Sequence, residues 1–122
     1  MEVGIDILDI DRMEHLIKKQ TFLTKFFHQK EIDYINTCTE NFKPQILAGY
    51  YSCKEAFLKA LGLGIGRGID LKDICVQYTE FGKPYLELSS NALKIFKNMG
   101  FNNISCNISD SKNVVVAICI VY

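Results

Sequence analysis

Apolar and polar positions alternate along the first strand-like stretch of the chain. Between Glu2 and Leu8, apolar residues alternate with small or acidic ones: Val3, Ile5 and Ile7 against Gly4 and Asp6. A period of two predicts a β-strand. Aspartate is unfavourable inside a strand, so Asp6 needs a specific reason to be there.

Helical spacing replaces this alternation in the next part of the chain. The apolar positions predict helices at Asp11–Lys19, Phe22–Phe27, Lys30–Asn36 and Pro44–Leu61. Asp11 and Glu14 have the spacing of a capping box. Pro44 suits the first turn of the longest helix, and Gly62 suits its end.

The remainder of the chain predicts a hairpin, one more helix and a second pair of strands. Residues 62–68 contain four glycines and are expected to form a loop. The elements expected after it are strands Ile74–Thr79 and Tyr85–Leu88 around a turn at 81–84, a helix from Ser89 or Ser90 to Met99, and strands Ile104–Ser109 and Val114–Val121 around a turn at 110–113. Helix-separated strands do not repeat regularly, so we predict an α+β fold, with an antiparallel sheet packed against helices.

Length and composition limit the classes of protein that the chain can represent. Its 122 residues suit one domain, residues 1–122. A formal net charge of zero argues against a dedicated nucleic-acid binder. There is no apolar run near the ~20 residues of a membrane span, and the first residues lack the order of a signal peptide, so we expect a cytoplasmic protein that does not enter a membrane. The five scattered cysteines are expected to be free thiols in the core.

One side of the longest predicted helix carries candidate chemistry. Ala48, Ser52, Glu55 and Lys59 follow one another at spacings of four, three and four, which places them on one face. An ordinary ion pair on a solvated helix explains Glu55 and Lys59 equally well. Lys54 falls near the apolar stripe, where its side chain either follows the surface to water or points into a pocket.

Asp6 and Glu55 would form a minimal magnesium site if the fold brought them together. Mg²⁺ typically takes one or two protein carboxylates and completes its shell with water and phosphate oxygens. Asp6 could instead cap a neighbouring helix. The glycine loop is a weak signal, although close backbone approach to an anion beside Arg67 is compatible with it.

A basic segment lies between the first strand and the long helix. From Arg12 to Lys30 there are five basic residues and one acid, Glu14, interleaved with apolar side chains. This composition is typical of a solvated amphipathic helix. It also fits a docking face for an acidic partner, attracted by charge and held by apolar contact.

Two segments together resemble the bacterial holo-acyl-carrier-protein synthase family. The run Gly4-Ile5-Asp6-Ile7-Leu8-Asp9-Ile10-Asp11-Arg12 is similar to the family's G-x-D-x-x-x-x-x-R opening. The run Lys54-Glu55-Ala56-Phe57-Leu58-Lys59-Ala60 is similar to its K-E-A-x-x-K-A helix, and the Gly82-Lys83-Pro84 turn also fits. Length and the order of elements agree from end to end. Many members have a histidine where this chain has Asp110, so no role of that histidine carries over.

The resemblance implies a Mg²⁺-dependent transfer of 4′-phosphopantetheine from coenzyme A to a serine of apo-acyl carrier protein, with release of adenosine 3′,5′-bisphosphate, in fatty acid biosynthesis. It implies that Asp6 and Glu55 hold the metal and that Lys59 contacts the phosphates, all three being catalytic. The general base is either Glu55 or a metal-bound water. Coenzyme A would contact Lys54, Lys59, Gly62, Gly64, Arg67, Lys83 and Pro84. Arg12, Leu16 and Lys19 would dock the carrier protein, and a homotrimer would place each site at a subunit interface.

Other functions remain open on the sequence. A relative that modifies a carrier domain of a polyketide or peptide synthase would have the same motifs. A non-catalytic module for coenzyme A or nucleotides would not need the pair Asp6 and Glu55 together with Lys59. A small oligomeric scaffold would explain the apolar content but not Lys54 beside an apolar stripe.

Overall fold

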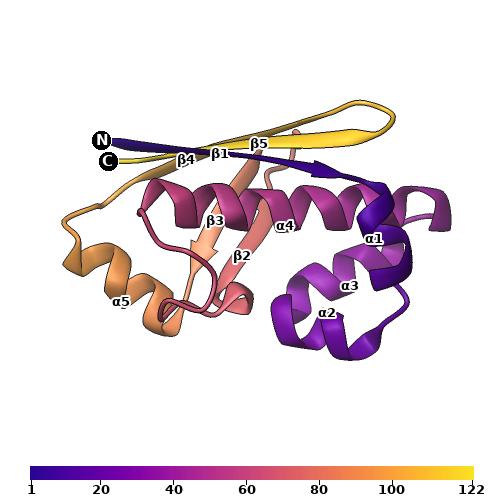
Figure 1. The fold of residues 1–122 in the computed structure, drawn as a ribbon, viewed down its shortest axis with the longest axis horizontal. Helices are drawn as coiled ribbons and strands as arrows, with labels where there is room; N and C mark the ends of the chain where they lie inside the picture. The colour runs from indigo at the N-terminus through magenta and orange to yellow at the C-terminus, as the bar shows by residue number, and fades with distance from the viewer.

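The computed structural model describes residues 1–122 as five strands, five α-helices and two short 3₁₀ helices (Figure 1). The strands are β1 (Glu2–Asp9), β2 (Ile74–Tyr78), β3 (Pro84–Leu88), β4 (Ile104–Asp110) and β5 (Val114–Val121). The helices are α1 (Asp11–Leu16), α2 (Gln20–Phe26), α3 (Gln29–Thr37), α4 (Lys43–Ala60) and α5 (Ser90–Asn98), with η1 (Glu40–Phe42) and η2 (Leu71–Asp73).

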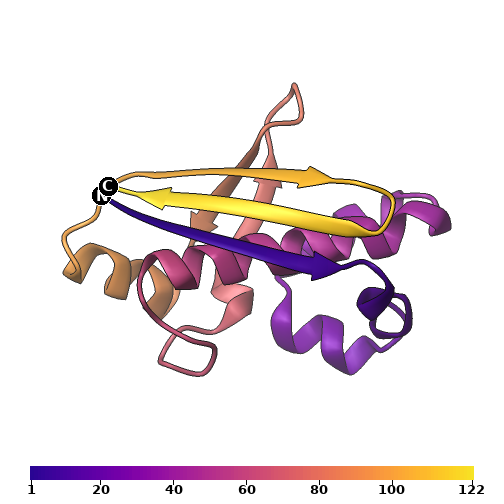
Figure 2. The same cartoon turned by 45° about the horizontal axis from the view of Figure 1, so that its top comes forward.

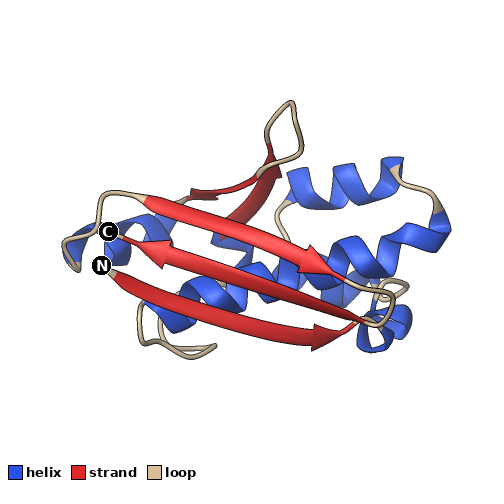
Figure 3. Cartoon of the chain, turned by 90° about the horizontal axis from the view of Figure 1, so that it is seen from above, coloured by secondary structure: helices blue, strands red, loops and turns tan.

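The strands form an antiparallel three-stranded sheet and a separate hairpin. The sheet has the order β1-β5-β4, so the first and last strands of the chain are neighbours, with Glu2 opposite Val121. Strands β2 and β3 pair with each other, and β3 packs against β4. Figure 3 shows β1 and β4 at opposite edges of the sheet, with the hairpin beyond β4. The predicted α+β fold with an antiparallel sheet is confirmed.

Helix α4 is the central element of the core. It runs beneath the three-stranded sheet, with α1–α3 at one end and α5 at the other (Figures 1 and 2). Its side chains are buried on almost every side, from Leu47 to Ala60. A helix covered all round needs polar partners for whatever polar side chains it carries inward.

Several details of the sequence analysis need correction. Helix α1 ends at Leu16, not at Lys19, because a break precedes α2 at Gln20. The helix has no side-chain cap at its start, so the capping box expected at Asp11 is wrong. A cap of this kind is instead found at the start of α3, where Glu31 accepts the backbone N–H of His28 and the His28 ring accepts the backbone N–H of Lys30.

The prediction of free thiols is confirmed for all five cysteines and that of a core position for four, since Cys38 is only half-buried. All five cysteines are free thiols, and four of them are buried: Cys53, Cys75, Cys106 and Cys119. None of the helices combines enough apolar residues with enough length for a membrane span.

The side chains on the outer face of β1, which points away from α4, are apolar. Val3, Ile5 and Ile7 are 60%, 59% and 66% exposed, whereas the alternate residues Gly4 and Leu8 are buried against α4. Ile118 of the neighbouring strand β5 is also exposed, on the same outer side by alternation. A continuous apolar stripe on a sheet face is typical of a contact surface with another protein.

Gly4 allows β1 to approach α4 closely. A Cβ atom at this position would lie 1.9 Å from the carbonyl oxygen of Ala56 and 2.5 Å from the amide nitrogen of Ala60. Both atoms belong to helix backbone, so neither can move aside cheaply. The absence of a side chain at Gly4 therefore sets the spacing between the strand and the helix.

We predict that Gly4→Ala lowers the free energy of unfolding by about 3 kcal/mol or more, because the overpacked strand must separate from the helix. Urea unfolding followed by circular dichroism measures the change. Gly49→Ala in α4 is the matched control: its Cβ would meet only Ile108 at 3.6 Å, an ordinary contact. Since alanine favours a helix over glycine, Gly49→Ala should be neutral or stabilising by about 0.5–1 kcal/mol. Equal stability of the two variants would contradict the close approach at Gly4.

Candidate active site

Asp6 lies on the inner side of β1 and is held by two side chains of α4. Its Oδ2 accepts a hydrogen bond from Ser52 Oγ at 2.9 Å, and its Oδ1 pairs with Lys59 Nζ at 3.1 Å. The Asp6 side chain is 14% exposed, so it can still meet a ligand from solvent. The helix face predicted from Ser52 and Lys59 does therefore turn toward Asp6, which explains an aspartate inside the strand.

Lys59 supplies a cation beside Asp6. Its ammonium also donates to the carbonyl oxygen of Ile5 at 3.0 Å, while 53% of the side chain is exposed. An exposed ammonium that forms one ion pair and one carbonyl contact keeps a donor for an incoming anion. This end of α4 thus combines a carboxylate with a partly free positive charge.

Glu55 lies one helical turn before Lys59 and is half-buried. Burial raises the pKa of Glu55, and the negative charge of Asp6 raises it further, against the opposing effects of Lys59 and Arg12. A carboxylate whose ionisation is disfavoured by a second one nearby marks a site where a cation is stabilising. Both offer hard oxygen ligands of the kind that Mg²⁺ prefers.

Tyr51 is a neighbour of Glu55 that the sequence analysis did not single out. Burial raises the pKa of Tyr51, and the adjacent Glu55 carboxylate raises it further, while Arg12 lowers it. The signal that could have found it is spacing, since Tyr51 precedes Glu55 by four residues, one turn of the same helix.

The predicted docking residues lie beside this cluster. Arg12 and Leu16 belong to α1, and Lys19 directly precedes α2. Arg12 and Lys19 are exposed and Leu16 is half-buried. Because Arg12 acts electrostatically on Glu55, the basic surface begins next to the carboxylates. We call Arg12, Leu16 and Lys19 the docking face.

The residues expected to bind coenzyme A are divided between two hollows of the chain. Lys59 and Gly62 line a hollow of about 370 Å³ at the end of α4. Lys83 and Pro84 line a different hollow, of about 450 Å³, together with Asp110. The first lies on the β1 side of the sheet and the second beyond β4.

The glycine loop that follows α4 carries the other two of these residues. Gly64 and Arg67 are exposed, as is Gly62 at the start of the loop. Positive φ angles of 72° at Gly62 and 80° at Gly66 fit the need for glycine at those positions.

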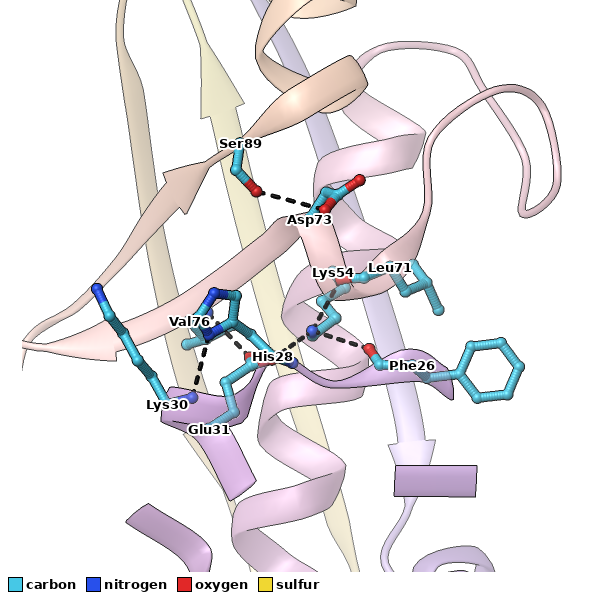
Figure 4. Close-up of polar contacts among 9 residues, drawn as sticks. All are labelled: Phe26, His28, Lys30, Glu31, Lys54, Leu71, Asp73, Val76 and Ser89. Atoms are coloured by element: carbon cyan, nitrogen blue, oxygen red, sulfur yellow. Dashed lines mark hydrogen bonds and ion pairs between the residues drawn. The ribbon is translucent and has the colours of Figure 1, made fainter. Parts of the chain in front are cut away.

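Lys54 lies outside the candidate site, which corrects its expected role in binding coenzyme A. Its side chain is completely buried, and its ammonium contacts the Glu31 carboxylate at 2.6 Å (Figure 4). Its other acceptors are the carbonyl oxygens of Phe26 and Leu71. A fully buried ammonium with three protein acceptors has no donor left for a ligand.

Comparisons with known proteins agree with this arrangement. Residues 2–119 match the 4′-phosphopantetheinyl transferase superfamily. The chain is 41% identical over 120 residues to the holo-[acyl-carrier-protein] synthase of Syntrophus aciditrophicus, covering 96% of this chain and 91% of that protein. It is similar in fold to the holo-[acyl-carrier-protein] synthase of Helicobacter pylori in complex with coenzyme A, with a TM-score of 0.84, 30% identity, and 98% and 99% of the two chains covered.

A second solved structure gives the same result. It is a holo-(acyl-carrier-protein) synthase from Bacillus anthracis in complex with coenzyme A (3′,5′-ADP), with a TM-score of 0.82 and 28% identity, and the match covers 98% of this chain and 94% of that one. Motifs, fold and site geometry thus point the same way, and the chain belongs to the 4′-phosphopantetheinyl transferase superfamily.

Proposed function

We propose that this protein is a holo-[acyl-carrier-protein] synthase, which transfers 4′-phosphopantetheine from coenzyme A to a serine hydroxyl of apo-acyl carrier protein. Adenosine 3′,5′-bisphosphate is the other product. The observation that carries the proposal is the convergence of Asp6, Glu55 and Lys59 at one end of α4 in a chain of this superfamily. A module that only binds coenzyme A would not need this combination of charges.

The donor set at Asp6 and Glu55 fits Mg²⁺. Both side chains offer carboxylate oxygens, and the negative charge of Asp6 disfavours ionisation of Glu55. Without a metal ion, the cation that pairs with Asp6 is the Lys59 ammonium. When bound there, Mg²⁺ would neutralise charge on the pyrophosphate of coenzyme A. Asp6 and Glu55 would hold it, which frees the Lys59 ammonium to donate to a phosphate oxygen.

Glu55 is one of two candidates to take the proton of the attacking hydroxyl, the other being a water molecule. Burial and Asp6 raise the pKa of Glu55 in the metal-free chain, and a bound cation would oppose that effect. Phosphoryl transfer depends mainly on positioning and charge neutralisation, which Lys59 and a cation held by the two carboxylates would provide.

We further propose a homotrimer with each site at a subunit interface. The hollow of Lys59 and the hollow of Lys83 lie at opposite edges of the three-stranded sheet and share no lining residue. A neighbouring subunit would bring its Lys83 edge to the Lys59 edge. The exposed apolar stripe of Val3, Ile5 and Ile7 supports such an assembly.

The docking face would receive an acidic helix of the carrier protein. Arg12 lies next to Glu55, so a helix held by Arg12, Leu16 and Lys19 would present its serine beside the carboxylates. A carrier domain of a polyketide or peptide synthase would dock by the same chemistry. The cytoplasmic location stays a prediction.

Transfer itself is measured by incubating the protein with apo-carrier protein, coenzyme A and Mg²⁺ and weighing the carrier by mass spectrometry. We expect the mass of the carrier to rise by one phosphopantetheine. Asp6→Asn and Glu55→Gln should each reduce kcat/KM by about 10²-fold or more, because each removes a ligand of the cation that would neutralise the phosphoryl charge. Asp9→Asn, on the same strand but exposed, is the matched control. An unmodified carrier, shown competent with another transferase, would refute the function.

For Arg12→Ala we expect the KM for apo-carrier protein to rise about tenfold, since an interfacial charge next to the reaction centre is lost. The Kd for coenzyme A, measured calorimetrically, should stay within about twofold. Lys94→Ala on α5, another exposed cation, should change neither value. A matching loss of coenzyme A affinity in Arg12→Ala would remove Arg12 from the docking face.

The proposed assembly predicts that Ile7→Asp shifts the protein from trimer toward monomer in sedimentation velocity, because a charge would be buried between subunits. Leu93→Asp makes the same change at an exposed apolar residue of α5 and should leave the trimer intact. A wild-type protein that sediments as a monomer at micromolar concentration would contradict the shared site.

A further inference from the structure

The ion pair of Lys54 and Glu31 is a polar feature of the core with no part in the transfer chemistry above. Both side chains are completely buried, and the ammonium and carboxylate are 2.6 Å apart. The two residues lie 23 positions apart, on α4 and α3. Ion pairs are rare in cores because two charges must be removed from water, so a specific role is expected of one that is retained.

The ammonium of Lys54 joins three other segments to α4. It donates to Glu31 Oε1 in α3, to the Phe26 carbonyl at 3.1 Å and to the Leu71 carbonyl at 2.9 Å (Figure 4). Phe26 is the last residue of α2, and Leu71 begins η2. All three N–H donors are therefore used, each toward a different segment. The ring of Phe27 adds a cation–π contact, with its centroid 4.8 Å from Nζ.

Glu31 extends the connection to the hairpin. Its Oε1 also accepts the backbone N–H of His28, and its Oε2 accepts the backbone N–H of Val76 in β2, both at 2.9 Å. The carboxylate thus caps α3 and fixes β2 at the same time. Together the two side chains tie α2, α3, η2 and β2 to one turn of α4.

This turn of α4 also carries the reaction site. Lys54 immediately precedes Glu55, and the two side chains leave the helix about 100° apart. On the β1 side, Ser52 and Lys59 bind Asp6. Helix α4 is consequently held on two sides, by hydrogen bonds to Asp6 and by the buried pair.

The buried pair also controls the end of α2 opposite the docking face. Lys19 precedes the first residue of α2, and Lys54 binds the carbonyl at the last residue, Phe26. An ammonium at a helix C-terminus is favourable for the helix dipole as well as for the carbonyl. If this anchor were lost, α2 could shift along or away from α4, and Lys19 would move relative to Glu55.

An apolar pair of the same volume would not hold α2 in the same way. Dispersion contacts have little directionality, whereas each hydrogen bond of Lys54 and Glu31 specifies a partner and an orientation. Apolar replacements would also leave buried polar groups of Phe26, Leu71 and Val76 without these partners. The geometry is therefore suited to fixing relative placement and not only to burying surface.

We infer that Lys54 and Glu31 are positioning residues, which fix α2 and α3, and with them the Lys19 end of the docking face, relative to Glu55. The inference rests on the proposed transfer function. It assigns to Lys54 a role without contact to coenzyme A or metal. Its consequence is that loss of the pair acts more strongly on presentation of the carrier protein than on coenzyme A binding, because Lys54 contacts α2 directly and contacts none of the other residues expected to bind coenzyme A.

The first test compares Lys54→Met with wild type in the full-length enzyme, at a temperature where both are folded by circular dichroism. We expect kcat/KM for apo-carrier protein to fall about tenfold or more, because small displacements of a docked substrate strongly reduce the rate. The Kd for coenzyme A should stay within about twofold. Glu31→Gln retains the shape of the side chain but only one of its two acceptor oxygens, so it should show a loss of the same kind.

A stability control separates positioning from general destabilisation. Phe96→Leu removes contacts of a buried ring on α5 with Phe57 and Phe101, away from α2 and α3. This variant should lower the melting temperature while leaving the kcat/KM for apo-carrier protein and the Kd for coenzyme A unchanged. If Lys54→Met reduces carrier kcat/KM no more than Phe96→Leu does, the positioning role is refuted. Should Lys54→Met not fold, Glu31→Gln decides the question by the same comparison.

A second readout does not depend on catalysis. Hydrogen exchange of the free enzyme is followed by mass spectrometry. In Lys54→Met, the backbone amides of α2 and α3 should exchange about tenfold or more faster than in wild type. Exchange in β1 and β5 should increase only as much as the loss of global stability requires. Uniform acceleration would refute the inference. If the wild-type protein transfers no phosphopantetheine, the proposed function is refuted. If the wild-type protein is active but hydrogen exchange in Lys54→Met is accelerated uniformly, only the positioning role is refuted.

Discussion

The buried contact between the Lys54 ammonium and the Glu31 carboxylate is the interaction on which the arrangement of this fold depends. Removing two charges from water costs several kcal/mol for each ion, and burial accordingly raises the pKa of Glu31 and lowers the pKa of Lys54. Mutual attraction and five hydrogen bonds involving the two side chains oppose that cost. These bonds exist only when α2, α3, η2 and β2 are all in place, so the pair makes their assembly cooperative.

On the opposite side of α4, the packing depends on a close approach between the backbones of β1 and α4 and not on a buried ion pair. Because Gly4 has no side chain, β1 lies against the helix backbone, and Asp6, two residues on, reaches Ser52 and Lys59. The reaction site thus exists because one strand can approach one helix. Helix α4 carries the chemistry on its strand-facing side and the structural ion pair on another, which explains why the lysines of one short motif, Lys54 and Lys59, have different environments.

The sequence predicted most elements, because periodicity is a local property. That Asp6 meets the helix face of Glu55 was implied only by the resemblance to a family, since the two residues are distant in sequence. The sequence could not identify the partner of Lys54, since Glu31 comes from another helix and its own sequence context resembles a surface helix. Alternation in β1 predicted a strand but not which face is covered, because a period of two is the same for both faces. The division of the Lys59 and Lys83 regions between opposite sheet edges depends on strand order, which no local pattern contains.

The pairing of the first strand with the last has a consequence for how the chain is made. With Glu2 opposite Val121, β1 has no partner strand until β5 has been synthesised, and β5 must complete the sheet between β1 and β4. Contacts between residues so distant in sequence form slowly, so the sheet is expected to close late in folding. Until then β1 has an unpaired edge beside the apolar side chains of Val3, Ile5 and Ile7. The interval before closure is the period in which nascent chains are most exposed to aggregation.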